Sequence, residues 1–470
     1  MNQRKKLIWP IVLLIAGSAV YAGNLADTFL HSNFGRPSAV ARTSDIFPYG
    51  ASASADPNVG LDSDLGPVEL VWKVLKIIKD FYVDPIDPIN NSKMAHNAVK
   101  YMVASLGDSN SQFLDKDQSK VLAEMAGGSF QGMGAVLKIR EKKEATYTDQ
   151  QLTIVAPLPG SPAEKAGLQP GDVISELNGK WVMSHDPFTG VYKLQKNFKA
   201  TFAEKKKVFS DAKALQEKAI SLDEASQKLM SSKDELNLTV IRDGKELPAV
   251  KIVPAPMTAD VVVYKMLPDG TGYIHLVLLT ADTPKRFSTA LKDLADRGAK
   301  NVVLDLRNAP GGSIIAAQCV AGALIGNKDL ATVVRSKGRK ETICGKGKPV
   351  ASMHIVGLVN MGTEGATEVL AAGLKGAAGM KLIGATTWGN AFERTAFRLE
   401  DGSGYTLTTG KYTPAGKKDF HGKGIKPDAV VPMSPLKIGT SADTQLARAV
   451  AVVKRPVAAL ASPSAKELKS

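Results

Sequence analysis

Cysteine is nearly absent from this chain, whose 470 residues include only Cys319 and Cys344. Two cysteines cannot form the dense disulfide framework that stabilises small secreted domains. They can pair in an oxidising compartment or remain two separate buried thiols, because sequence separation does not report the distance between two Cα atoms. The fold must therefore rest on hydrophobic cores, and the length predicts two or three folded modules.

Paired metal ligands and nucleic-acid motifs are also missing. The six histidines are scattered singly, with no His-x-x-x-His spacing, so we expect no metal site and no cofactor. The formal net charge is +14, but the lysines are spread out and no Arg-rich run with interleaved aromatics occurs. This spread of the basic residues argues against nucleic-acid binding and leaves two interpretations, a soluble basic protein or one that meets an acidic partner or an anionic envelope surface.

Long apolar runs are confined to the first residues. Arg4, Lys5 and Lys6 precede an apolar stretch from residue 7 to about residue 20, followed by small residues up to Ala22. This order is typical of a secretory signal peptide, and Pro10 together with the short length argues against a stable membrane anchor. We expect export to the periplasm or cell envelope, with retention by an uncleaved N-terminal segment as the alternative.

The remaining chain divides by composition and periodicity. Residues 23–66 are rich in Ser, Ala, Asp and Pro without a sustained period, which predicts a flexible tether. Apolar residues then recur at helical spacing on both sides of the Asp-Pro turns at Asp84 and Asp87, which predicts two amphipathic helices. The expected division is 1–22 signal peptide, 23–66 tether, 67–125 N-terminal helices, 126–255 second module, 256–435 third module and 436–470 C-terminal helix and tail.

The second module resembles a PDZ domain. Its glycine-rich loop is followed by an alternating strand from Ala135 to Ile139, and glycines allow backbone NH groups to converge on a terminal carboxylate. Residues 161–168 (SPAEKAGL) and 170–174 (PGDVI) match the helix, turn and strand of such domains, and Asn178-Gly179 predicts a hairpin turn. The resemblance implies peptide binding at Phe130, Gly132, Met133, Gly134 and Ala135; the alternative is that these glycines only make turns.

An extra segment, residues 183–220, interrupts this module. Its apolar residues fall on one helical stripe that includes Phe198, Phe202 and Phe209, while Lys205, Lys206 and Lys207 contribute to a basic surface. Two interpretations compete: a helix packed on its own domain, or a docking surface for an acidic protein or an anionic membrane. We expect self-packing, which would bury the phenylalanines.

The third module carries the most specific resemblance. A buried strand, 301–308, ends in Ala309-Pro310-Gly311-Gly312 before a helix, and two further blocks, 410–414 (GKYTP) and 422–428 (GKGIKPD), follow in order. These motifs resemble the tail-specific, or carboxyl-terminal processing, serine-lysine proteases over roughly residues 67–455. The resemblance implies a multidomain α+β fold: N-terminal helices, a PDZ domain with a helical insertion, and an α/β protease core. It also implies an oxyanion-hole-like set of NH groups at Gly311, Gly312 and Ala366.

The catalytic positions of that family are changed here. Its nucleophilic serine lies in a turn that reads GTEGATE at 362–368, so that Gly365 takes its place. Its general-base lysine aligns with Asn390, 25 residues further on, and the glutamine that orients the lysine aligns with Arg394. Glycine has no nucleophilic atom and a neutral amide cannot accept a hydroxyl proton as an amine does. Thr363, Thr367 and Ser313 have no visible lysine or histidine partner at family spacing.

Two functions remain for such a chain. The first is a non-catalytic protein that binds unfolded or C-terminal polypeptide segments, or regulates an active protease or an acidic envelope protein through residues 183–220. The second is an active serine-type endopeptidase with rearranged catalytic residues. Loss of nucleophile and base together lowers turnover by on the order of a million-fold, which favours the first.

Overall fold

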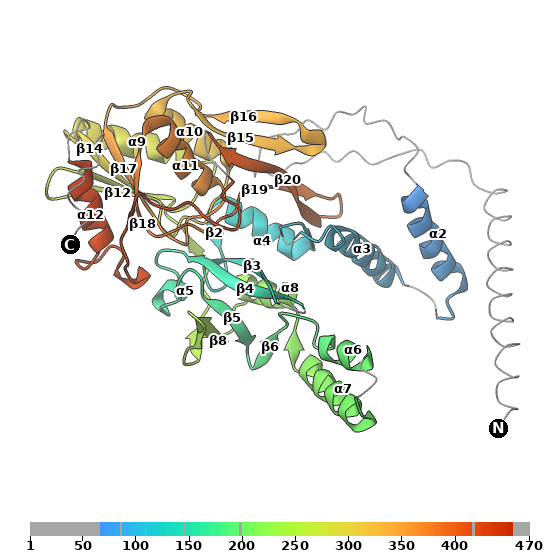
Figure 1. Ribbon diagram of the computed structural model, residues 1–470. Helices are drawn as coiled ribbons and strands as arrows, with labels where there is room; N and C mark the ends of the chain where they lie inside the picture. Colours follow the sequence, from blue (N-terminus) through green and yellow to red (C-terminus); the bar gives the residue numbers. More distant parts are fainter. Residues whose placement is uncertain are drawn as a thin grey trace, which may run out of the picture. The chain divides into compact units, whose positions relative to one another are not determined.

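The computed structural model describes residues 66–84, 87–108, 110–144, 147–196, 200–415 and 419–454. The predicted signal peptide and tether, up to residue 65, lie outside these residues. Within them, no helix is both long and apolar enough to cross a membrane. The structure is a multidomain α+β arrangement of several sheets and helices, as predicted (Figure 1).

The protease-like core is built on a six-stranded sheet. Its order is β12 (Val262–Met266), β13 (Gly272–Leu276), β14 (Asn301–Asp305), β17 (His354–Val359), β18 (Lys381–Gly384) and β21 (Ala429–Val430). All neighbours are parallel except β12 and β13. The strands read as apolar runs because helices cover both faces, as in other sheets of parallel strands.

Alternate residues along each strand face opposite layers of helix. Ile274, Val302 and Leu304 pack with α9 (Thr283–Asp296), α10 (Ile314–Ile325) and α11 (Ala366–Ala378). Tyr273 and Val303 instead face α12 (Thr444–Val453). This alternation follows from the two-residue period of a strand. The parallel pairing of β14 with β17 places their carboxyl ends side by side.

A second sheet adjoins this core. Its order is β1 (Gln112–Leu114), β20 (Gly404–Pro414), β15 (Asp329–Arg335) and β16 (Lys340–Cys344), with β19 (Phe392–Arg398) also paired to β20. Strand β1 follows the N-terminal helices α2 (Gly66–Phe81) and α3 (Pro88–Ala104) and precedes α4 (Lys116–Ala126). The two helices predicted around the Asp-Pro turns are therefore present.

The PDZ module has its own sheet and its own hydrophobic core. The sheet order is β10 (Val250–Ile252), β8 (Leu236–Arg242), β5 (Val173–Leu177), β4 (Thr148–Pro157) and β3 (Ala135–Lys143), and the helices are α5 (Pro162–Lys165) and α8 (Leu222–Ser231). Asn178 and Gly179 both have positive φ, which confirms the predicted hairpin turn. Within this path β3 is an end strand with an open edge. Three short strands also belong to this sheet: β6 (Lys180–Val182) pairs with β5 and with β7 (Ala219–Ile220), and β9 (Lys245–Glu246) pairs with β8.

The insertion forms two helices, α6 (Thr189–Lys196) and α7 (Phe202–Glu217), between β6 and β7. The phenylalanines are not buried as expected: Phe202 is 83% exposed and Phe209 is 50% exposed, whereas Phe198 lies outside the described residues. The burial expected for Phe202 is therefore wrong. Phe209 is covered in part, because its ring packs against that of Phe188 with the centroids 5.7 Å apart. Ala212 is a buried residue of α7.

Candidate functional site

The site lies where two loops leave neighbouring parallel strands. The loop after β14 runs to Gly312, and the loop after β17 runs to Gly365, which precedes α11. In sheets of parallel strands, ligand and catalytic sites form in the crevice at the carboxyl ends of the strands. Gly311, Gly312, Gly365 and Ala366 are therefore brought together by the topology of the sheet.

Side-chain amides hold these two loops in one arrangement. The backbone NH of Asn308 donates to Asn360 Oδ1 at 2.9 Å, and Asn360 Nδ2 donates back to Asn308 Oδ1 at 2.8 Å. Thr363 Oγ1 donates to the carbonyl of Leu306 at 2.7 Å and accepts from the NH of Asn360. Asn308 adopts a left-handed φ of 53°, which asparagine tolerates better than most residues. The loops are thus locked by contacts that do not involve a catalytic group.

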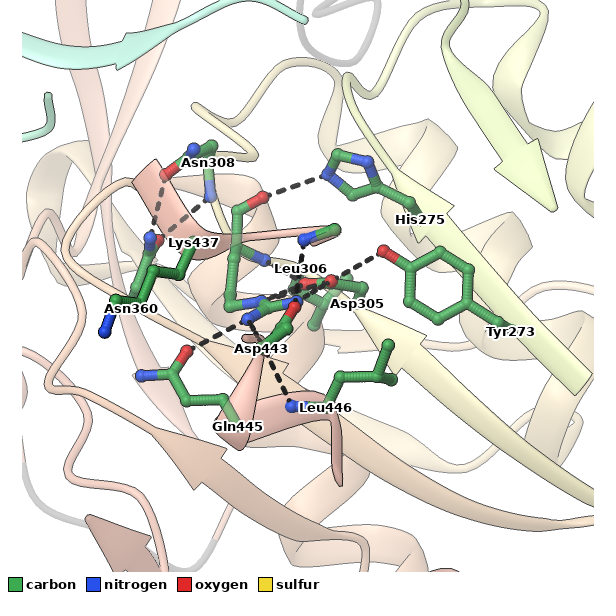
Figure 2. Close-up of polar contacts among 12 residues, drawn as sticks. Tyr273, His275, Asp305, Leu306, Asn308, Asn360, Lys437, Asp443, Gln445 and Leu446 are labelled. Atoms are coloured by element: carbon green, nitrogen blue, oxygen red, sulfur yellow. Dashed lines mark hydrogen bonds and ion pairs between the residues drawn. The ribbon is translucent and has the colours of Figure 1, made fainter. Parts of the chain in front are cut away.

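A buried ion cluster supports the first of these loops from below (Figure 2). The guanidinium of Arg307 is fully buried; Nη2 donates to Asp305 Oδ2 at 2.6 Å and to Asp443 Oδ2 at 2.8 Å. Its Nη1 also donates to Gln445 Oε1, and the Tyr273 hydroxyl donates to Asp305 Oδ2. The Arg307 charge lowers the pKa of Asp305 against the opposing effect of burial. The cluster ties α12 to β14 immediately before the glycine turn.

Gly365 occupies the turn from which a nucleophile would project. It precedes α11 with φ 57° and ψ −123°, a region in which side-chain-bearing residues are strained. Such a sharp strand-to-helix turn presents the nucleophile of several hydrolases. A Cβ placed at Gly365 would meet no atom within 4 Å, so the space that a side chain would use is open. The turn is present, but Gly365 itself has no side-chain atom that could act as a nucleophile.

Asn390 is hydrogen-bonded to a carboxylate that sequence reasoning did not single out. Its Nδ2 donates to Glu364 Oε1 at 2.5 Å, and Lys138 Nζ, from β3 of the PDZ module, pairs with the same oxygen. The Lys138 side chain is 15% exposed and that of Glu364 is 5% exposed. Burial lowers the pKa of Lys138, Glu364 opposes this, and Arg394 lowers the pKa further. A lysine therefore lies near the former catalytic turn, but it comes from another module and is already paired.

Glu368, in the first turn of α11, forms hydrogen bonds both to the Gly365 turn and to the loop of residues 387–390. Its carboxylate accepts from the NH groups of Gly365 at 3.1 Å, Gly389 at 2.7 Å and Asn390 at 2.8 Å, and from the hydroxyl of Thr387. Burial raises the pKa of Glu368 to about 7, although these donors act in the opposite direction. This residue fixes the backbone at Gly365 and at Asn390 at once.

The oxyanion-hole-like groups keep the backbone geometry of a glycine turn. Gly311 has φ 91° and Gly312 has φ 123°. Leu279 bonds to the carbonyl of Gly311 and to the NH of Ser313, which directs the NH of Gly312 away from Leu279. Ala366 begins α11, where the first NH groups of a helix have no intrahelical acceptor. A Cβ at Gly311 would lie 3.0 Å from Glu364 Oε2, so a carboxylate lies against this turn.

The predicted peptide-binding loop joins β3 to the rest of the PDZ module. Phe130 is buried in β2 (Ser129–Phe130), which pairs with β11 (Met257–Thr258). Met133 is fully buried, and its NH already donates to the carbonyl of Leu229 in α8 at 2.9 Å. Gly132 and Gly134 have positive φ, and Ala135 begins β3. The Met133 NH is therefore engaged within the protein.

The other candidate groups have structural contacts. Ser313 caps α10 by accepting from the NH of Ala316, and Thr363 is committed to the loop contacts described above. Thr367 is fully buried, and its hydroxyl has no hydrogen-bond partner among the described residues. Cys319 and Cys344 are free thiols. The described part of the chain contains no cluster of three His, Cys, Asp or Glu side chains placed to hold a metal ion.

Comparisons with known proteins agree with this architecture. The family model "Peptidase family S41" matches residues 270–431, and the model "PDZ domain" matches residues 153–187. The chain is 28% identical over 468 residues to a carboxyl-terminal-processing protease of Synechocystis, covering 97% of this chain and 96% of that protein. It is 30% identical over 357 residues to the carboxy-terminal processing protease CtpA of Bacillus subtilis, covering 76% of this chain and 67% of that protein.

A solved structure shows the same fold. The photosystem II D1 C-terminal processing protease is similar with a TM-score of 0.56 at 24% identity, covering 77% of this chain and 92% of the other. At this identity the likeness speaks for the fold, whereas activity depends on the residues of the site.

Proposed function

The chain belongs to the carboxyl-terminal processing proteases of peptidase family S41, and from this membership we propose that it binds polypeptide segments without cutting them. The observation that carries the proposal is the pair of Gly365 and Glu364. The first provides no nucleophile on an otherwise retained turn, and the second engages the side chains of Asn390 and Lys138. Covalent catalysis requires a nucleophile within reach of a base.

The alternative function, an active endopeptidase with rearranged residues, has one observation in its favour. Lys138 is a buried amine with a lowered pKa, which is the usual state of a lysine base. Among the described residues no hydroxyl is hydrogen-bonded to Lys138: its Nζ bonds to Glu364, the Thr363 hydroxyl donates to the Leu306 carbonyl, Ser313 caps α10, and the buried Thr367 hydroxyl has no partner. Geometry therefore favours the non-catalytic function.

A digestion assay tests the proposal. We expect the purified protein to leave an unfolded, tailed substrate intact and to remain unlabelled by a serine-directed fluorophosphonate. As a matched pair, Gly365→Ser/Asn390→Lys/Arg394→Gln should gain cleavage relative to Gly365→Ala/Asn390→Lys/Arg394→Gln, because only the first restores a nucleophile. Cleavage by the alanine version would reveal a contaminating protease.

Binding is proposed to occur along the open edge of β3. An extended peptide adds to a free strand edge through backbone hydrogen bonds, and α8 lies across the groove from β3. Leu137, Ile139, Leu222 and Met230 line that groove with apolar surface. This mode suits unfolded or C-terminal segments and needs no side-chain nucleophile.

Export to the cell envelope and a protein partner are proposed as well. The apolar N-terminal run with its preceding basic residues supports export. On α7, Phe202, Lys206, Phe209 and Lys213 recur at spacings of four, three and four residues, which places them on one helical face. Exposed aromatics beside lysines favour an acidic envelope protein, for example an active protease, as the partner of this face.

The experiment uses the wild type and Phe202→Ala/Phe209→Ala as baits for pull-down from an envelope fraction, and repeats the binding with each candidate partner in purified form. Loss of one acidic partner supports the proposal. Sedimentation with vesicles of anionic lipid, lost in the same variant, would identify a membrane surface instead.

A further inference from the structure

A cavity joins the PDZ groove to the former catalytic turn. Its volume is about 180 Å³, and its walls come from β3 and α8 on one side and from the Gly312 and Gly365 turns and β19 on the other. Cavities of about 150 Å³ are large enough for one benzene-sized apolar group. The apolar part of the wall includes Met125, Phe130, Leu278 and Ile314. The space therefore fits about one apolar side chain.

The charges that line this cavity are paired, with one exception. Lys138 pairs with Glu364, Asp223 with Lys100, and Glu393 with Arg335, as three separate ion pairs. The Tyr412 hydroxyl donates to Glu393. Arg394, at the position where the family has glutamine, lines the same cavity, and within the described residues its guanidinium has no hydrogen bond or ion pair. Within the described residues, the cavity therefore holds one cation without an ion pair, in a wall that is about half polar and half apolar.

Lys138 and Arg394 also act on one another. The charge of Arg394 lowers the pKa of Lys138, as expected for two cations that share a cavity. The Lys138–Glu364 pair is neutral in sum, so it does not supply the anion that Arg394 lacks. A half-buried guanidinium without a carboxylate is unusual in proteins, because guanidinium groups form strong bidentate contacts with carboxylates.

We propose that Arg394 binds the terminal carboxylate of a polypeptide whose last residue is apolar. The apolar side chain would occupy the cavity, and the preceding residues would pair with the open edge of β3. Gly365, with no side chain and open space around it, leaves room for the chain end. This inference rests on the proposed function. It assigns to the cleft the binding of the peptide's C-terminus in place of peptide-bond cleavage. The Met133 NH, already bonded to Leu229, cannot serve this role without losing that bond.

Titration of a fluorescein-labelled decapeptide ending in leucine, as free acid and as amide, tests the inference. We expect the full-length protein to bind the acid roughly 10- to 100-fold more tightly, in line with a hydrogen bond between charged groups. Arg394→Gln should remove this preference while leaving the affinity for the amide unchanged, and Arg394→Glu should reverse it. Arg398→Gln, on the same strand but exposed, is the matched control and should keep the preference.

Thermal unfolding checks that Arg394→Gln is folded; no loss of stability is expected, since no ion pair is removed. A preference for the acid that persists in folded Arg394→Gln overturns the inference and leaves the proposed function standing. Failure of the wild type to bind either peptide contradicts both. Shortening of the peptide, seen by mass spectrometry, contradicts the proposed function alone.

Discussion

Two clusters of charged residues lie next to the Gly311 turn, one around Arg307 and one around Glu364, and they differ in how they are built. The Arg307 cluster is fully buried, and its guanidinium is bonded on all sides by Asp305, Asp443 and Gln445. The cluster around Glu364 joins groups from two modules, lies beside a cavity and, within the described part of the chain, leaves Arg394 without an ion pair. The first supports the glycine turn, whereas the second occupies the place where chemistry occurs in the family.

The difference indicates that the scaffold and the chemistry of the site can separate. The asparagine-linked loops, the Gly365 turn and Glu368 still define the shape of a hydrolase cleft. In the proposed function, Gly365 and Asn390 stand where the family has its serine nucleophile and lysine base, and Arg394 stands where it has the glutamine that orients the lysine. A cleft that keeps its shape without a nucleophile and a base can still bind a polypeptide. The two clusters should therefore respond differently to substitution.

Removing the buried arginine should have the largest effect on stability. Arg307→Met leaves Asp305 and Asp443 buried without their counter-charge, and we expect the free energy of unfolding to fall by about 3–5 kcal/mol. Urea denaturation followed by fluorescence measures this. Arg297→Met, which breaks the exposed pair with Asp293, is the control and should change stability by about 0.5 kcal/mol or less. Equal effects would mean that the Arg307 cluster is not a structural support.

The pH dependence of stability should report Glu368. Its folded pKa of about 7 lies above the ordinary value, so the folded state holds a proton that the unfolded state has released between about pH 4.5 and 7. Stability from this group is present below pH 4.5 and is lost as the pH rises toward 7. We expect a loss of about 1–3 kcal/mol between pH 5 and pH 8.

Denaturation of Glu368→Gln at the same pH values isolates this contribution, because the glutamine does not titrate. The curve of the variant should be flatter than that of the wild type. Parallel curves would show that the Glu368 carboxylate is ionised throughout and that its four donors dominate over burial.

Breaking the Lys138–Glu364 ion pair, which joins two modules, should lower the free energy of unfolding less than removing Arg307 does. In Lys138→Met, Glu364 retains the Asn390 amide, so we expect destabilisation of about 1–2 kcal/mol. Lys142→Met, on the same strand but in an exposed pair with Glu144, should be close to neutral. The double variant Lys138→Met/Glu364→Gln should recover part of the loss, since the unpaired carboxylate is gone. A loss larger than that of Arg307→Met would reverse the comparison.

The exposed phenylalanines should have the smallest effect on stability. Phe202→Ala/Phe209→Ala removes side chains that lie mostly in solvent, so the midpoint of thermal unfolding should stay close to that of the wild type. A large decrease would show that the insertion packs more firmly than its exposure indicates.

Local patterns predicted the features that depend on neighbouring residues. The turn glycines and the Asn178-Gly179 hairpin could be predicted because each belongs to a short motif. Glu364 and Lys138 were missed because 226 residues separate them, and no local pattern reports such a contact. The partners of Arg307 are similarly distant at Asp443 and Gln445. The stripe on the insertion showed its apolar face but not what covers it, which is why Phe202 is exposed against expectation and Phe209 is covered only in part, by Phe188.

The central claim is that this site binds chains without cutting them, and turnover measures it most directly. The purified wild type is incubated with an unfolded, tailed substrate at enzyme-to-substrate ratios near one, and the products are followed by mass spectrometry. The account predicts an intact substrate, because Gly365 has no nucleophilic atom. Reproducible cleavage that disappears on changing Thr363 or Thr367 to alanine would contradict it and would assign the nucleophile to that threonine.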